Sequence, residues 1–204
     1  MKTFSLLLVF TLSLVACDQR MDTSLPILGE PSIDDNGDLV HYKAPSFSFT
    51  DQLNQHVSNE DYDGKVHVVD FFFSTCPTIC PVMTGHLRLV QDHFEKEDRL
   101  GIISYSIDPK HDTPEQLAAY ADRYGVDGSK WALLTGYETD VFELAKDYKV
   151  RAFDDSMGGQ SNILHDGTFV LIDDQRRIRG YYNGLEKTDV SRLIGDIEQL
   201  LKTM

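Results

Sequence analysis

Two cysteines four positions apart are the residues of this chain best suited to chemistry. Cys76 and Cys80 lie in the segment Val66 to Pro81, which reads VHVVDFFFSTCPTICP. At this spacing the two sulfurs can form one disulfide or share one soft metal ion. A purely structural disulfide closing so short a loop would contribute only roughly 2 kcal/mol to stability. We therefore interpret the pair as a site that is redox-active, metal-binding or both.

The residues before the pair predict a strand and those after it predict a helix. The run from Val66 to Phe73 is apolar except for His67 and Asp70, which is typical of a strand buried on both faces. The apolar spacing of three and four that follows is helical, at Leu87, Val90 and Phe94. The thiols thus lie where a central strand passes into a helix, where open α/β sheets place their chemistry.

Pro81 refines the expected position of each thiol. Proline suits the first position of a helix, and the residue before a proline disfavours the α conformation. Cys80 is therefore predicted to be the N-cap, with Cys76 in the preceding loop. The partial positive charge at a helix N-terminus favours thiolate over thiol.

Composition limits the class of protein. The 204 residues are 41% hydrophobic and 25% charged, which suits one globular domain with a tail. The net charge of -14 argues against nucleic acid as a partner and against electrostatic docking on anionic lipid. Three cysteines are too few for a disulfide scaffold.

The first 16 residues are predicted to be a signal peptide. Lys2 precedes an apolar run, Phe4 to Val15, that is too short to span a bilayer comfortably. The run ends in Leu14-Val15-Ala16-Cys17, which resembles a bacterial lipoprotein signal with cleavage before Cys17 and lipid on its thiol. An ordinary signal peptide or a short membrane anchor remains the alternative. Each interpretation exports the domain, and lipid would hold it at the periplasmic, extracytoplasmic side of the membrane.

The chain after the lipid site divides into a tether and a domain. Residues 17–43 are rich in Asp, Pro, Gly and Ser and lack periodicity, so we expect a flexible tether in which residues 18–41 pack against nothing. Residues 44–204 are predicted to form the domain. Phe47 and Phe49 alternate with polar residues, and a second short strand is expected near His56, which together predict an amino-terminal hairpin.

The remaining elements alternate between strand and helix. Strands are expected at 100–107, 131–134, 168–172 and 177–182, and helices at 114–124, at 141–148 and in an amphipathic stretch from Val190. Thr113 and Pro114 should begin the second helix, and Gly125 should end it. This order predicts an α/β fold of thioredoxin-like layout, with a central mixed sheet flanked by helices.

One histidine could complete a metal site. His165 precedes the strand 168–172, in a loop that would face the thiols in such a layout. Two thiolates and one imidazole form a three-coordinate site that is soft enough for Cu(I) and acceptable to Cu(II). The alternative is an ordinary surface-loop histidine. The other histidines have weaker claims, and Met83 is expected in the core.

Three motifs together resemble the Sco/SenC family. They are CPTICP, then DPKHDTP, then a histidine shortly before FVLID, within a resemblance that runs from about Ala44 to Gly184. The family comprises membrane-anchored, thioredoxin-like copper proteins associated with building the dinuclear copper centre of cytochrome c oxidase. The resemblance implies copper as the bound metal, with Cys76, Cys80 and His165 as its ligands.

The same resemblance implies a metallochaperone rather than an enzyme. Its partners would be the copper-bearing oxidase subunit or its assembly factors, with a thiol reductant as a further partner. Asp108 and Asp112 match the family's acidic loop, but N-capping and turn roles explain them equally well. The sequence departs from the family at Leu164-His165-Asp166, where Asp-His-Ser is usual, so the partner that orients the imidazole is undefined.

The cysteine pair is also compatible with other functions. A thiol–disulfide oxidoreductase would use both thiols directly, although the spacing is CxxxC and no proline lies between Asp154 and Gln175 to form a cis-proline loop. A thiol peroxidase is disfavoured because neither cysteine has Thr or Ser three residues before it and Pro seven before it. A redox or copper sensor stays open.

Overall fold

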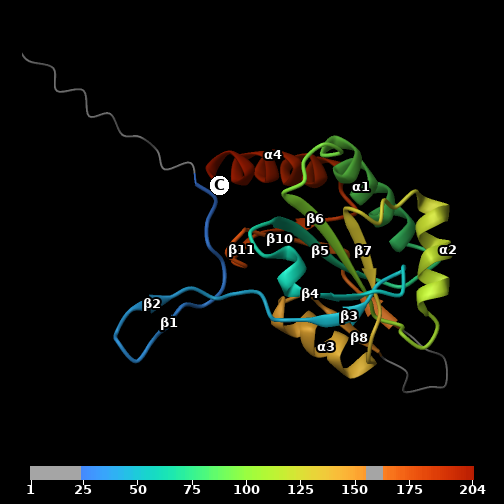
Figure 1. Ribbon diagram of the computed structural model, residues 1–204, viewed down its shortest axis with the longest axis horizontal. Helices are drawn as coiled ribbons and strands as arrows, with labels where there is room; N and C mark the ends of the chain where they lie inside the picture. Colours follow the sequence, from blue (N-terminus) through green and yellow to red (C-terminus); the bar gives the residue numbers. More distant parts are fainter. Residues whose placement is uncertain (1–23, 155–162) are drawn as a thin grey trace, which may run out of the picture.

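A five-stranded mixed sheet forms the centre of the molecule (Figure 1). The computed structural model describes residues 24–154 and 163–204. The strand order across the sheet is β11-β10-β5-β6-β7, in which β5, β6 and β7 run parallel and β10 is antiparallel to both of its neighbours. The bounds are β5 (Val66–Phe72), β6 (Leu100–Ser106), β7 (Trp131–Leu134), β10 (Thr168–Ile172) and β11 (Ile178–Asn183).

The continuous apolar runs explain why β5 and β6 occupy the middle of the sheet. All seven residues of each strand are buried, because helices cover the sheet on one side and a helix and a hairpin cover it on the other. Successive side chains alternate between the two faces: Val68 and Phe72 belong to one core cluster, while Val69 and Phe71 belong to the other.

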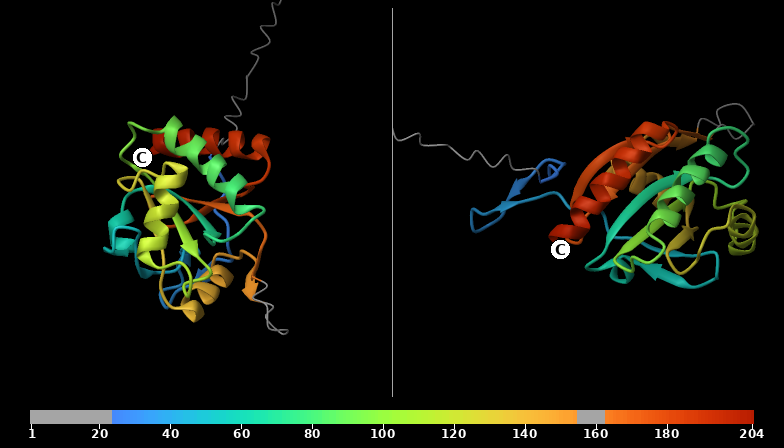
Figure 2. Two further views of the ribbon diagram at one scale, coloured as in Figure 1. Left: turned by 90° about the vertical axis from the view of Figure 1, so that its right-hand side faces the viewer. Right: turned by 90° about the horizontal axis from the view of Figure 1, so that it is seen from above.

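The two faces have different covers. Helices α1 (Cys80–His93), α2 (Pro114–Tyr124) and α4 (Lys187–Thr203) cover the face that holds Val68. Figure 2 shows α1 and α4 side by side over this face. Helix α3 (Glu138–Asp147) and the hairpin of β3 (Ser48–Thr50) and β4 (His56–Ser58) cover the other face. The predicted thioredoxin-like fold and its amino-terminal hairpin are confirmed.

The predicted signals for α2 are also observed. The Thr113 hydroxyl accepts a hydrogen bond from the backbone N–H of Gln116, and Pro114 begins the helix. Gly125 ends it with φ of 68°, a left-handed conformation that glycine adopts without strain.

Five short elements were not predicted. These are β1 (Ser32–Ile33), β2 (Leu39–Val40), the 3₁₀ turn η1 (Asn59–Tyr62), β8 (Ala152–Asp154) and β9 (Ile163–His165). The segments of these five elements show no periodic apolar pattern in the sequence, and the four strands among them form beside a partner strand. Residues 154–162, where Gly158-Gly159 predicts a loop, lie almost wholly outside the described residues.

The expectation that residues 18–41 pack against nothing is wrong for the segment Leu25 to Gly29. Leu25 packs against one core cluster and Leu28 against the other. The backbone N–H of Leu28 donates to the carbonyl of Ile178 at 2.8 Å, so the segment covers part of the exposed edge of β11.

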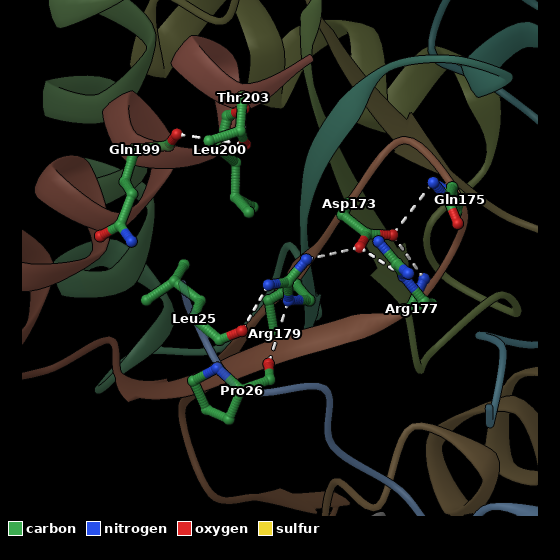
Figure 3. A network of polar contacts seen from close by, with 9 residues as sticks. All are labelled: Leu25, Pro26, Asp173, Gln175, Arg177, Arg179, Gln199, Leu200 and Thr203. Carbon is green, nitrogen blue, oxygen red and sulfur yellow. Dashed lines mark hydrogen bonds and ion pairs between the residues drawn. The ribbon is translucent and has the colours of Figure 1, made fainter. Parts of the chain in front are cut away.

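A buried guanidinium fastens this segment (Figure 3). Arg179, 9% exposed, donates to the carbonyls of Leu25 and Pro26 and forms an ion pair with Asp173 at 2.8 Å. A chain segment read as tether therefore becomes part of the domain, because the edge strand carries a cation that needs acceptors.

No helix within residues 24–154 and 163–204 combines the length and the apolar character that crossing a membrane requires.

Candidate metal-binding and redox site

The two thiols lie where β5 passes into α1, as expected, but the helix begins one residue earlier than expected. Cys80 is the first helical residue and Ile79 is the N-cap, whose carbonyl accepts the N–H groups of Val82 and Met83 at 3.0 Å. The prediction of Cys80 as N-cap is wrong by one position. A proline in the first turn removes an N–H that has no helical acceptor there, so Pro81 fits just as well when the helix starts at Cys80.

Both thiols are reduced and buried. Cys76 is 8% exposed and lies in the loop, whereas Cys80 is 1% exposed beneath the first turn of α1. The Cys80 thiol donates a hydrogen bond to Cys76 Sγ, and Thr78 Oγ1 lies 3.7 Å from that same sulfur. The side chains of Cys76 and Cys80 are therefore already paired in the dithiol state.

Hydrogen bonds favour the thiolate at Cys76. Burial raises the pKa of this thiol, but the backbone N–H groups of Cys80 and Thr78 and the side chains of the same two residues donate to its sulfur and lower it. The net pKa of Cys76 lies below the ordinary value for a thiol.

Cys80 is affected in the opposite direction. Burial raises its pKa well above the ordinary value, and the adjoining Cys76 sulfur and the carboxyl of Asp70 raise it further. The backbone N–H of Phe73 opposes this shift without cancelling it. The pair thus contains one thiol poised to ionise and one held protonated, which is the arrangement in which one sulfur attacks and the other is released or recruited later.

Asp70 is a buried acid on the same face of the sheet. Its carboxylate, 2% exposed, accepts a hydrogen bond from the Ser104 hydroxyl, which in turn accepts from the Trp131 indole N–H at 2.8 Å. Burial raises the pKa of Asp70 to about 7. In the sequence, Asp70 interrupts an apolar strand, and a charged residue inside a run buried on both faces is itself a signal of a special role.

The acidic loop after β6 contacts the cysteine loop. Asp112 is fully buried and accepts hydrogen bonds from the backbone N–H and hydroxyl of Ser74 and from the Ser106 hydroxyl. Asp108 forms an ion pair with the exposed His111 at 2.7 Å. The turn roles expected for this loop are present, and Asp112 additionally makes a contact 38 residues away in sequence.

The expected loop position of His165 is corrected. Its backbone lies in strand β9 and pairs with Ala152 of β8, while its side chain is outside the described part of the structure. Val170 of β10 pairs antiparallel with Val69, so β10 begins where β5 ends. Gly167 also lies against α1, because a Cβ added there would be 3.7 Å from Met83 Sδ. The backbone that follows His165 thus enters the sheet beside the carboxyl end of β5, where the cysteine loop begins.

Other possible donors have structural roles. Met83 is 1% exposed in the core, as predicted. His86 Nδ1 bonds the Gly184 carbonyl at 2.7 Å, and burial lowers the pKa of His67 to about 4. Among the described side chains, no cluster of three or more His, Cys, Asp or Glu residues could hold a metal ion.

A thioredoxin-like domain with a CxxxC dithiol at the first turn of α1 defines the class of this protein. Residues 38–202 match the SCO1/SenC family model, and the chain belongs to this family. It is 33% identical over 162 residues to the SCO1 protein homolog of Bacillus subtilis (strain 168), covering 79% of this chain and 84% of that relative.

Solved structures agree with this assignment. A SCO1/SenC family lipoprotein from Bacillus anthracis str. Ames matches with TM-score 0.72 and 31% identity over 78% of this chain and 95% of that one. BsSco, described as a cytochrome c oxidase assembly protein with a disulfide switch, matches with TM-score 0.67 and 33% identity, covering 78% and 93%. Yeast Sco1 with copper bound matches at 24% identity and TM-score 0.64, covering 79% and 90%, and shows the fold alone.

Proposed function

We propose that this protein binds copper through Cys76, Cys80 and His165 and delivers it to, or prepares the thiols of, the dinuclear copper centre of cytochrome c oxidase. The observation that carries the proposal is the reduced pair of hydrogen-bonded thiols at the start of α1, one with a lowered pKa. Family membership supports it, since BsSco is described as an oxidase assembly protein.

The donor set suits copper in either oxidation state. Thiolates are soft donors, and two of them can hold Cu(I) in near-linear coordination, whereas Cu(II) prefers more ligands and includes nitrogen among them. Removal of either thiol is therefore expected to abolish tight binding of both states. Removal of the imidazole is expected to weaken the binding of Cu(II) strongly and the binding of Cu(I) less.

The decisive experiment is a copper titration of the reduced domain. The variants are Cys76→Ser, Cys80→Ser and His165→Ala, each titrated with Cu(I) against a competing chelator and with Cu(II) by its thiolate charge-transfer absorption. His93→Ala is the matched control, because His93 ends α1 at the other end from the thiols and pairs with Glu198 on the surface. A protein lacking both thiols that still bound one copper with unchanged affinity would refute the proposal.

A second candidate function is the reduction of a partner's disulfide. The specific observation in its favour is the asymmetry of the pair, with a lowered pKa at Cys76 and a raised pKa at Cys80. Cys76 would attack a partner disulfide, and Cys80 would then attack Cys76, so two electrons pass to the partner and the Cys76–Cys80 disulfide forms. A copper-free assay on a small model disulfide separates this function from copper binding, and retention of full rate in Cys76→Ser would exclude it.

We also propose that Cys17 carries the lipid that anchors the exported domain to the membrane. The signal-like start of the sequence supports this, as does the description of the Bacillus anthracis relative as a lipoprotein. Mass spectrometry of the membrane-bound protein should show a chain that begins at a diacylated Cys17. An intact amino terminus or an unmodified Cys17 would contradict the anchor.

A further inference from the structure

One buried carboxylate connects two loops at the carboxyl edge of the parallel strands. Asp112, with no exposed surface, accepts the Ser74 N–H at 3.0 Å, the Ser74 hydroxyl, and the Ser106 hydroxyl at 2.5 Å. Ser74 belongs to the loop after β5 and Ser106 ends β6. A single side chain thus joins the ends of two neighbouring strands.

Ser74 lies within the turn that aims Cys76. The Cys76 N–H donates to the Phe73 carbonyl at 3.2 Å and closes a four-residue turn whose second residue is Ser74. The ladder between the two strands stops just before it, where the Ile107 N–H donates to the Phe72 carbonyl. Beyond that point, Asp112 hydrogen-bonds both to the turn, at Ser74, and to the end of the next strand, at Ser106.

Asp112 itself is held rigidly. The N–H groups of His111 and Asp112 both donate to the Asp108 carbonyl, at 3.0 and 2.9 Å, and the Asp108 N–H donates to Ser106 Oγ at 3.1 Å. Thr113, the next residue, caps α2. These hydrogen bonds fix the backbone of the loop on both sides of Asp112. The carboxylate can therefore hold Ser74 in one position.

We propose that Asp112 is a positioning residue that holds the Phe73–Cys76 turn so that Cys76 Sγ stays against Cys80. Its effect is to raise the effective concentration of one thiol next to the other, both for disulfide formation and, if the proposed function holds, for sharing one copper ion. Asp112 touches neither sulfur in this role, and its action passes through Ser74.

Substitutions separate position from charge. Asp112→Ala removes every contact to Ser74 and leaves its N–H without that acceptor. Asp112→Asn removes the charge but keeps the shape: the amide oxygen accepts the Ser74 N–H, and the amide N–H₂ donates to the Ser74 hydroxyl, which can rotate to accept. Ser74→Ala removes the hydroxyl and keeps the backbone contact. If Asp112 acts by position, the dithiol–disulfide equilibrium should change strongly in Asp112→Ala and hardly at all in Asp112→Asn. The change in Ser74→Ala should be intermediate.

The test is the dithiol–disulfide equilibrium of the metal-free domain in glutathione buffers. Two thiols of the protein give two electrons and two protons to oxidised glutathione, so the protein disulfide and two reduced glutathione molecules form. We expect the equilibrium constant for the disulfide to fall about tenfold in Asp112→Ala, two- to threefold in Ser74→Ala and less than twofold in Asp112→Asn. Copper affinity should fall in the same order.

Asp51→Ala is the matched control. Asp51 is also a buried loop carboxylate, 5% exposed, that accepts two backbone N–H groups, from Leu53 and Gln55. It lines a cavity with Leu100 and Trp131, the first residues of β6 and β7, at the edge of the sheet opposite the thiols. Asp51→Ala should lower stability without changing the disulfide equilibrium.

Each outcome decides the proposal. If Asp51→Ala changes the disulfide equilibrium as much as Asp112→Ala does, the cause is a general loss of stability. If Asp112→Asn changes it as much, the cause is the loss of charge. Either result overturns the proposal. If Asp112→Ala does not fold, an unchanged equilibrium in Ser74→Ala overturns it instead. Wild-type protein that binds no copper would refute the proposed function, while the glutathione measurement would still test the positioning role of Asp112.

Discussion

At the scale of single residues, Cys76 and Cys80 differ far more than their similar settings in the sequence suggest. Both lie close to the same helix N-terminus, yet the pKa of Cys76 is lowered and that of Cys80 is raised. The difference follows from burial and from the direction of the hydrogen bonds, since N–H donors converge on one sulfur while the other donates.

This asymmetry predicts the order of alkylation. As pH rises from 6 to 9, iodoacetamide should modify Cys76 first, because its thiolate forms at lower pH, and Cys80 should react slowly throughout. Peptide mass spectrometry of briefly treated, reduced protein gives the site of labelling. Cys80→Ser should leave Cys76 reactive, and preferential labelling of Cys80 in the wild type would contradict the assignment.

At the scale of elements, β5 contains a buried carboxyl group, Asp70, whose ionised form destabilises the folded protein. Asp70 has a pKa of about 7 in the folded protein and 3.8 as its ordinary value, so the folded state holds the proton more tightly. Stability from this group is fully present below about pH 4 and is lost as pH rises through 7.

We therefore expect Asp70→Asn to become stabilising with increasing pH. Relative to wild type, its free energy of unfolding should rise between pH 4 and pH 8 by up to on the order of 4 kcal/mol, the equivalent of moving the pKa from 3.8 to about 7. Urea unfolding at both pH values measures this. Asp98→Asn on the surface is the control, and a difference that did not grow with pH would mean that folding does not raise the pKa of Asp70.

Replacing either of two helix glycines by alanine should have opposite effects on stability, because their backbone conformations and surroundings differ. Gly125 ends α2 with φ of 68°, and a Cβ there would lie 1.9 Å from Arg88 Nη1. Gly125→Ala should therefore lower the free energy of unfolding by about 1 kcal/mol or more. Gly85 is exposed within α1 with nothing within 4 Å of its added Cβ, so Gly85→Ala should raise it by about 0.5–1 kcal/mol. Thermal unfolding of both variants checks the opposite signs.

At the scale of the whole molecule, the amino-terminal segment Leu25 to Gly29 belongs to the folded domain. It gives apolar side chains to both core clusters and backbone acceptors to Arg179. The path from the proposed lipid site to the domain is correspondingly shorter than a tether ending at residue 43 would allow.

Removing this segment should destabilise the domain. A soluble form beginning at residue 30 should be less stable than one beginning at residue 18 by about 1–3 kcal/mol, because Leu25 and Leu28 lose burial and the buried Arg179 loses two acceptors. Urea unfolding compares the two forms. Ile33→Ser, at a 65% exposed position of the next hairpin, is the control and should change little. Equal stability of the two forms would mean that the segment contributes nothing.

Much of this protein follows from local sequence patterns. The apolar runs of β5 and β6, the helical spacing of α1 and the signals at both ends of α2 are each complete within a few residues, and all were predicted. The pair Cys76 and Cys80 was recognisable for the same reason, since its chemistry depends on a spacing of four and on a strand and a helix that adjoin it in the chain.

Only the tertiary structure decided which residues distant in the sequence contact one another. Asp112 reaches Ser74 across 38 positions, Ser104 reaches Asp70 across 34, and Arg179 reaches Leu25 across 154. Apart from Asp70, whose charge interrupts a buried apolar run, nothing in the local pattern of these residues distinguishes them from ordinary turn, strand and surface residues. Their roles arise because the parallel strands bring their carboxyl ends to one edge and the last strand leaves an edge to be covered, and both conditions exist only once the chain has folded.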